Sequence, residues 1–207
     1  MTSRNKLTTY RGKRHFGRTR EPQGGHASAG DTLCFVVQIH DASTLHFDFR
    51  LEVDGVLKSW SVPEGPSPDP QDKRLAMPTE DHPLEYRDFE GVIAEGEYGA
   101  GTVMVWDGGS YRPLSGKKGP SRTFSEALEH GHASFWLDGS KLHGGYALTR
   151  FRGGGPGWLL VKEGDERAGA RGTPDARRAR SVRSGRTPEA RRPGGGRGEG
   201  SGDDRGR

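Results

Sequence analysis

The residues from Cys34 to Glu52, CFVVQIHDASTLHFDFRLE, separate into hydrophobic and polar side chains with a period of two. Successive side chains of a β-strand point to opposite faces, so a strand of this kind packs one face in a core and turns the other face to solvent or to a polar site. The hydrophobic face carries Phe47, Phe49 and Leu51, and the polar face carries His46, Asp48, Arg50 and Glu52.

The residues before this strand predict its partner. Residues 35–40 are rich in β-prone side chains and place Gln38 and His40 on one face, while residues 41–44 have the composition of a turn. An antiparallel hairpin would then bring His40 close to His46 and Asp48.

Two imidazoles and a carboxylate that converge on one point predict a three-ligand metal site. Without a thiolate the set favours an open site, and it allows Mn²⁺, Zn²⁺ or Fe²⁺. Arg50, on the same face, predicts an anionic substrate, because a guanidinium beside a metal can hold a phosphate oxygen. The alternative interpretation is the solvated face of an ordinary half-exposed strand.

A second polar cluster contains Glu80 and His82, which share one face if the segment is extended, and Pro83 ends it. A histidine beside a carboxylate can be held in one tautomer and can donate a proton or bind phosphate. We expect Glu80 to orient His82. The alternative interpretation is a polar turn.

The middle of the chain predicts short strands separated by turn signals such as Asp54-Gly55 and several glycine runs. Their even spacing predicts a mainly β, single-domain fold with the architecture of an antiparallel β-barrel. A short helix is expected at Ser125–His130, after a capping serine. The expected strands are residues 34–40, 45–53, 56–62, 73–79, 102–107, 133–138, 145–151 and 157–162.

Composition predicts flexible ends. Hydrophobic residues make up 29% of the 207 residues and glycine occurs 34 times, so part of the chain cannot pack a core. From Gly164 onwards there is no aromatic residue, and Arg, Gly, Pro and Ser dominate. We therefore expect a basic N-terminal arm (1–30), a barrel domain (31–166) and a disordered Arg/Gly-rich tail (167–207).

Charge follows nearly the same boundaries. The formal charge is +6 for residues 1–30 and +5 for residues 165–207, so the total of +4 leaves −7 for residues 31–164. Basic flanks of this kind can hold a polyanion through salt-sensitive contacts while an acidic core performs the chemistry. The alternative is that the tail is only a solubilising extension.

Cys34 is the only cysteine, which excludes an intrachain disulfide framework and fits a reducing compartment. No signal-like apolar segment and no run of 18 apolar residues occurs. We expect a cytoplasmic protein without a membrane partner.

Three runs carry a resemblance to a known family: FVVQIHDASTLHFDFRLEVDGVLKSWSVPEGPS, KRLAMPTEDHPLEYRDFEGVIAEGEYGAGTVMVWD and WLLVKEGDE. Several long runs in order are more specific than any single motif, and together they resemble the 3′-phosphoesterase domain of bacterial DNA ligase D. The resemblance extends from about Leu7 to Glu166 and includes no ligase or polymerase module.

The resemblance implies a manganese-dependent hydrolase that heals 3′ ends. It would remove a terminal 3′ ribonucleotide and then the remaining 3′-phosphate of a primer, leaving a 3′-OH for non-homologous end joining by separate ligase or polymerase proteins. The implied metal ligands are His40, His46 and Asp48; the implied catalytic residues are Arg50, Arg74, Glu80 and His82; the implied substrate-binding residues are Arg14, Glu21, Gln38, Ser59 and Tyr86.

Two positions depart from the family pattern. Glu64 stands where the family usually has a lysine, and His15 stands where it has an aspartate. A carboxylate in place of a cation reverses the local field near a phosphate site and would weaken substrate binding or change which of the two reactions dominates. These departures sustain a second hypothesis, a catalytically silent module that binds nucleic acid ends. A third is a 2-His-1-carboxylate oxygenase, which the arginines and basic flanks fit less well.

Overall fold

The structure is a computed structural model that describes residues 6–25, 30–114, 122–151, 155–164 and 179–187. Along the chain it contains α2 (Thr8–Gly12), β1 (Cys34–Asp41), β2 (Leu45–Val53), β3 (Val56–Val62), β4 (Lys73–Pro78), the 3₁₀ helix η1 (Leu84–Asp88), β5 (Gly91–Ile93), β6 (Gly101–Leu114), α3 (Phe124–Glu129), β7 (His132–Gly139), β8 (His143–Arg150) and β9 (Trp158–Lys162).

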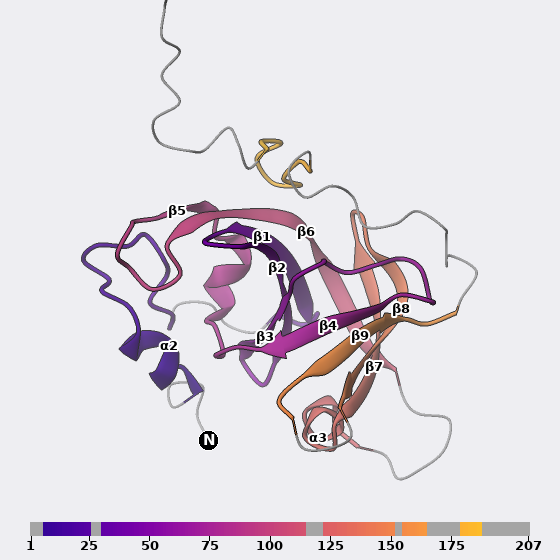
Figure 1. The fold of residues 1–207 in the computed structure, drawn as a ribbon. Helices are drawn as coiled ribbons and strands as arrows, with labels where there is room; N and C mark the ends of the chain where they lie inside the picture. The colour runs from indigo at the N-terminus through magenta and orange to yellow at the C-terminus, as the bar shows by residue number, and fades with distance from the viewer. Residues whose placement is uncertain (1–5, 26–29, 115–121, 152–154, 165–178, 188–207) are drawn as a thin grey trace, which may run out of the picture.

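The strands form an antiparallel barrel, as the sequence predicts. The order β1-β2-β3-β4-β9-β8-β7-β6 is closed by pairing between β1 and β6, and the short β5 adds to β6 (Figure 1). Closure leaves these eight strands without a free edge. The turn between β2 and β3 is the predicted Asp54-Gly55 pair, with both residues at positive φ (49° and 79°), as a two-residue hairpin turn requires.

Strand β6 is longer than predicted. The glycines at residues 108 and 109 suggest a turn, but the strand continues through them and pairs with β1, β5 and β7 in succession. A Cβ at Gly109 would lie 2.2 Å from the Asp138 carbonyl oxygen. Here glycine permits a close approach of two backbones and does not end the strand. The three-residue β5 is also absent from the prediction.

The short helix α3 is confirmed, but its predicted serine cap is wrong. Thr123 caps the helix, because its side chain accepts from the Glu126 amide while the Glu126 side chain accepts from the Thr123 amide. This reciprocal pair is a capping box, which fixes the helix start one residue earlier than predicted.

The β1–β2 hairpin is covered on both faces. The interior of the barrel holds the predicted hydrophobic face, where Phe49 stacks on Phe135 with ring centroids 5.9 Å apart. The outer face lies under a second hydrophobic cluster that includes Tyr10 of α2, Leu57 of β3 and Tyr86 of η1. The polar side chains of the hairpin are therefore enclosed, which contradicts the interpretation of an ordinary solvated strand face.

The N-terminal arm packs against the barrel over residues 6–25. Leu7 and Tyr10 are buried, and the Tyr10 hydroxyl donates to the Pro22 carbonyl at 2.7 Å. Residues 1–5 and 26–29 of the predicted flexible arm lie outside the described residues. The described part of the arm forms one wall of the polar face.

The predicted disordered tail lies largely outside the described residues, but residues 179–187 are an exception. Ala179 and Ser181 are buried, the Val182 amide donates to the Val105 carbonyl at 3.1 Å, and Lys141 Nζ donates to the Arg180 carbonyl at 2.6 Å. Figure 1 shows this segment in yellow beside β6. The prediction of disorder is wrong for these residues. It rests on their low content of hydrophobic side chains, whereas the segment is held by backbone groups and a serine, which such a count does not include.

Ending the chain after residue 178 is expected to lower the melting temperature. The lost burial and hydrogen bonds correspond to about 1–2 kcal/mol, or roughly 2–8 °C for a chain of this size. Differential scanning calorimetry of the full and shortened chains measures the change. The same melting temperature in both would mean that the docked segment adds nothing to stability.

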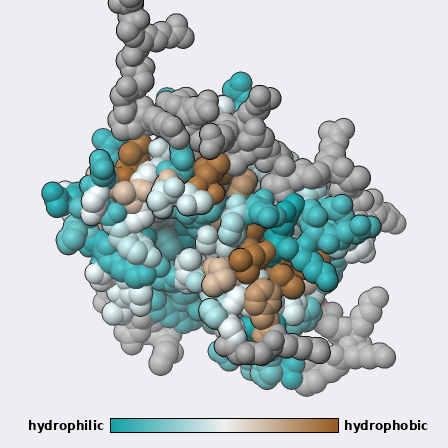
Figure 2. All heavy atoms as spheres, viewed as in Figure 1, coloured by the Kyte–Doolittle hydropathy of each residue, from teal (hydrophilic) through white to brown (hydrophobic). Residues whose placement is uncertain are grey.

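The surface in the view of Figure 2 is mainly hydrophilic, with patches of hydrophobic residues. Leu75 of β4 and Val92 of β5 are among the exposed hydrophobic side chains. Among the described helices, none is long and apolar enough to cross a membrane.

Candidate metal centre

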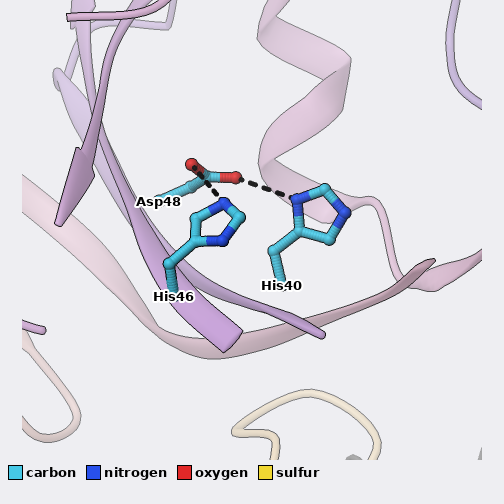
Figure 3. A group of neighbouring side chains, drawn as sticks. All are labelled: His40, His46 and Asp48. Atoms are coloured by element: carbon cyan, nitrogen blue, oxygen red, sulfur yellow. Dashed lines mark ion pairs between the residues drawn. The ribbon is translucent and has the colours of Figure 1, made fainter. Parts of the chain in front are cut away.

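The hairpin register places the three predicted metal ligands together. His40 of β1 pairs directly with His46 of β2, and Gln38 pairs with Asp48. The three side chains therefore project from the outer face next to the turn of the hairpin (Figure 3). Their ligand atoms all lie within 4.8 Å of one another.

Each imidazole presents one nitrogen to the carboxylate. His40 Nδ1 lies 3.7 Å from Asp48 Oδ2, and His46 Nε2 lies 3.7 Å from Asp48 Oδ1 (Figure 3). The other ring nitrogens donate to backbone carbonyls, His40 Nε2 to Gly99 and His46 Nδ1 to Thr44, both at 2.8 Å. These bonds fix the tautomers, so both lone pairs face the carboxylate, as metal-binding histidines require.

Gly99 has a backbone conformation that few other residues adopt. Its φ is +75°, and a Cβ built on it would lie 3.6 Å from His40 Cε1. A side chain there would be strained in the turn that aims the carbonyl at His40. The donor set therefore fits a divalent cation, with both imidazoles oriented by the backbone.

Asp48 is only 6% exposed and lies against Arg50, whose Nη2 donates to Asp48 Oδ2 at 3.0 Å. Burial alone would raise the pKa of Asp48, but the Arg50 guanidinium holds the pKa of that carboxyl well below its usual range. Asp48 is therefore a carboxylate, the form that can ligate a cation.

Arg50 is almost fully buried, at 2% exposure, and is held on several sides. Its Nε donates to Gln38 Oε1 at 2.8 Å, and its Nη1 donates to Ser59 Oγ at 2.8 Å. The ring of Tyr86 lies 4.9 Å from the guanidinium carbon. Gln38 is fixed in turn by donating to two backbone carbonyls of the η1 region. These contacts hold the Arg50 guanidinium in one orientation.

His82 lies beside Arg50 although it is 32 residues further along the chain. Backbone hydrogen bonds in both directions join it to Leu57 of β3, so the segment extends the sheet and is not a simple polar turn. Burial, reinforced by the charges of Arg50 and Arg14, holds the pKa of His82 well below its usual range. His82 is therefore neutral.

The position of the His82 proton follows from its neighbours. Nδ1 lies 2.8 Å from the Glu80 carbonyl oxygen, which can only accept, and this places the proton on Nδ1. Nη1 of Arg50 also lies 3.0 Å from His82 Nδ1, but it donates a hydrogen bond to Ser59 Oγ. Nε2 is then an acceptor and lies 3.4 Å from Arg14 Nη2. Glu80 thus orients His82 through its backbone carbonyl, where the sequence suggested the carboxylate.

The N-terminal arm completes the site with an ion-pair network. Arg14 donates to Glu21 Oε1 at 2.8 Å and to Glu80 Oε1 at 3.1 Å, and the Tyr86 hydroxyl donates to Glu21 Oε1 at 3.0 Å. Burial would raise the pKa of Glu80, but hydrogen bonds from its own backbone, Lys13 and Arg14 lower the pKa of that carboxyl. Glu80 is therefore an ionised partner of cations, not a proton donor.

A pocket of about 340 Å³ opens over these residues. The predicted residues that line it are Arg14, His40, His46, Asp48, Arg50, Glu80, His82 and Tyr86. Gln38, Ser59 and Glu21 lie behind this layer and hold its members. Eleven of the twelve predicted site residues therefore belong to one connected group of hydrogen bonds and contacts.

Arg74 is the predicted site residue that the structure places elsewhere. It pairs with Asp72 at 2.7 Å and with Glu64, and it does not line the pocket. Glu64 is one of the two departures from the family pattern, and its side chain is 76% exposed. The other departure, His15, pairs with Glu97 at 3.0 Å on the surface. Both departures therefore make polar contacts outside the pocket lining.

Sequence reasoning missed several contributors. Tyr10 stacks under Arg14, with the guanidinium carbon 3.8 Å from the ring centroid, and packs edge-on against His82. Tyr98 and Gly99 line the pocket from a glycine-rich loop that the sequence marked only as a break between strands. The backbone carbonyls that orient the histidines carry no residue-type signal at all.

Comparison with known proteins places this arrangement in a family. The profile of the DNA Ligase D 3′-phosphoesterase domain matches residues 38–150, more than half of the chain. Relatives include the multifunctional non-homologous end joining protein LigD of Pseudomonas aeruginosa, 51% identical over 172 residues, which are 81% of this chain and 20% of that protein. The protein of the same name from Mycolicibacterium smegmatis is 41% identical over 78% of this chain and 21% of its own length.

A further relative is the multifunctional non-homologous end joining DNA repair protein LigD of Mycobacterium tuberculosis, 43% identical over 72% of this chain and 19% of that protein. The chain thus spans about a fifth of the length of these curated relatives. The family profile covers the pocket-lining residues from His40 to Gly99, but not Arg14 of the N-terminal arm. The chain belongs to the DNA Ligase D 3′-phosphoesterase domain family.

Proposed function

We propose that this chain is a metal-dependent phosphoesterase that heals nucleic acid 3′ ends during the end joining of DNA breaks. It would remove a terminal 3′ ribonucleotide by releasing its nucleoside, which leaves a 3′-phosphate on the primer, and it would then hydrolyse that phosphate to a 3′-OH. The observation that carries the proposal is the convergence of His40, His46 and Asp48 in one pocket with Arg50 and His82. The family and the names of the relatives support the setting in end joining.

The proposed cofactor is Mn²⁺, held by His40 Nδ1, His46 Nε2 and a carboxylate oxygen of Asp48. Two imidazole nitrogens and one carboxylate suit a borderline divalent cation, and Zn²⁺ and Fe²⁺ are the competing ions. When bound, the ion would polarise a non-bridging phosphoryl oxygen and lower the pKa of the attacking group.

Arg50 would neutralise the charge that builds on the phosphoryl oxygens. A guanidinium has five N–H groups, and three of them serve Gln38, Ser59 and Asp48. The second hydrogen of Nη2 is then available to a substrate oxygen. Because the side chain is already immobilised, this stabilisation requires no reorganisation during the reaction.

His82 would act on a proton. Its neutral ring presents Nε2 as an acceptor toward Arg14 and the pocket. In this state it can accept a hydrogen bond from a substrate hydroxyl or take up a proton from the attacking group, and the buried Nδ1–H bond to Glu80 keeps the ring oriented. The product 3′-OH is the group that a polymerase extends or a ligase seals, so enzymes of those classes would act next.

The proposal is tested with a 5′-labelled primer annealed to a template and ending in one ribonucleotide. Incubation with Mn²⁺ should shorten the primer first to a 3′-phosphate and then convert it to a 3′-OH, two products that a denaturing gel separates. EDTA should stop both steps, and added Mn²⁺ should restore them. A primer retarded on a native gel but unchanged on the denaturing gel, with Mn²⁺, Zn²⁺ or Fe²⁺, would instead favour a silent end-binding module.

A further inference from the structure

The pocket at the metal centre continues into a second hollow beside it. Thr79, Glu80 and Tyr98 line both spaces, and the second hollow adds Lys6 and Lys13 from the N-terminal arm. Tyr98 therefore lies at the border between the pocket over the candidate metal centre and a space with two lysines.

Tyr98 and Phe151 are the two exposed aromatic residues among those that the structure describes, and Tyr98 is the one that lines the two hollows. The residue is 48% exposed, whereas Tyr10 and Tyr86 next to it are buried. A tyrosine ring has an apolar body and a polar hydroxyl, so at the rim of a pocket it is suited to contact a ligand.

The Tyr98 ring is also held in place. Lys13 Nζ donates to the Tyr98 hydroxyl at 3.0 Å and lies 4.4 Å from the ring centroid, while it bridges to Glu80 Oε2 at 3.1 Å. The Arg14 guanidinium carbon lies 5.6 Å from the same centroid. A fixed ring loses little entropy when a planar ligand stacks on it, and the adjoining cations favour an anionic neighbour.

A phosphate alone has no use for an aromatic surface, but a nucleotide has both a charged group and a flat base. Base stacking on exposed aromatic side chains, beside cations that follow the backbone, is how proteins hold single strands without selecting a sequence. The position of Tyr98 matches this chemistry. A phosphate bound in the pocket beside Asp48 and Arg50 would leave the rest of the nucleotide at the rim, where Tyr98 lies.

We propose that Tyr98 is the stacking platform for the base of the nucleotide that carries the reacting phosphate, and that Lys13 positions the ring. This inference rests on the proposed function, because it takes the reacting group to be a nucleic acid 3′-phosphate. It predicts that the enzyme senses the presence of a base at the 3′ end but not its identity.

The test uses two oligonucleotides with a 3′-phosphate that differ only in the terminal nucleotide, which is either normal or abasic. With Mn²⁺, the intact protein should prefer the normal end by about 5- to 100-fold in kcat/KM, the range expected for one stacked base. Tyr98→Ala should reduce this ratio to nearly one, whereas Tyr98→Phe should keep most of it because the ring remains.

The ratio is measured within each variant, so a general loss of folding or of metal affinity cancels. Phe151→Ala is the matched control, since Phe151 is another exposed aromatic residue, outside both hollows, and should leave the ratio unchanged. A preference that survives in Tyr98→Ala, or its absence in the unaltered protein, would overturn the inference.

Failure of the proposed function would look different. If the unaltered protein hydrolyses neither oligonucleotide with any metal, the same pair is compared by fluorescence anisotropy, which needs no turnover. A ratio of dissociation constants that collapses in Tyr98→Ala would then support the stacking platform on its own, and an unchanged ratio would refute it.

Discussion

Asp48→Asn is expected to reduce Mn²⁺-dependent hydrolysis by at least about 100-fold, since even residues that only orient metal ligands contribute 10- to 100-fold. The substitution preserves shape but removes the charge that faces both imidazoles and Arg50. Isothermal titration calorimetry should show that Mn²⁺ affinity falls together with activity.

The fold should survive this change at a cost. In the Asp48→Asn variant, Arg50 could still donate to the amide oxygen but would lose its buried anionic partner. This loss should lower the free energy of unfolding by about 3 kcal/mol. Circular dichroism and activity are therefore compared well below the melting temperature. Asp138→Asn is the matched control, because Asp138 also pairs with a histidine, His143 at 3.1 Å, but on the surface. Full activity in Asp48→Asn would show that the carboxylate is not a ligand.

Arg50→Lys is expected to lower kcat/KM by at least about 100-fold although the charge is retained. A lysine carries its three N–H groups on one nitrogen and cannot reach Gln38, Ser59 and Asp48, which the guanidinium contacts from three separate nitrogens. The loss of fixed donors at a developing charge accounts for this magnitude. Steady-state kinetics on a primer with a 3′-phosphate measures the effect.

The same variant should also be less stable, by about 1–3 kcal/mol, because buried acceptors lose their donor. Arg112→Lys provides the control: Arg112 lies 5.2 Å from the Trp136 ring but is exposed, so its replacement should change stability by less than about 0.5 kcal/mol. Wild-type kinetics in Arg50→Lys would mean that charge alone, without the planar fork, supports the reaction.

The clustering of His40, His46 and Asp48 could be predicted from the sequence because the three residues lie on one hairpin. The period of two assigns His46 and Asp48 to one face, and a turn of three or four residues brings His40 opposite. Both inferences are local. The barrel was also predictable, since regularly spaced strands with turn signals favour closure.

The remaining features depend on contacts between distant segments. Nothing in the sequence around Tyr10 or Tyr98 indicates that these rings meet Arg14, and the docking of residues 179–187 involves small and polar groups. Arg74 was predicted by family resemblance, and the structure instead joins it to Glu64, the position where this chain departs from the family. Such pairings are set by tertiary packing, which a local pattern does not encode.

The β1–β2 hairpin belongs both to the barrel core and to the candidate site, so the stability of the fold and the geometry of the site depend on the same register. Its inner face carries barrel core residues and its outer face carries all three proposed metal ligands, so a slip of one residue between β1 and β2 would exchange the two sets. The turn at residues 42–44 sets this register. An insertion or deletion in this turn should therefore prevent folding or activity, although surface turns elsewhere tolerate changes of length. A library that randomises the sequence and length of the turn, selected for active protein, should return many sequences but a single length.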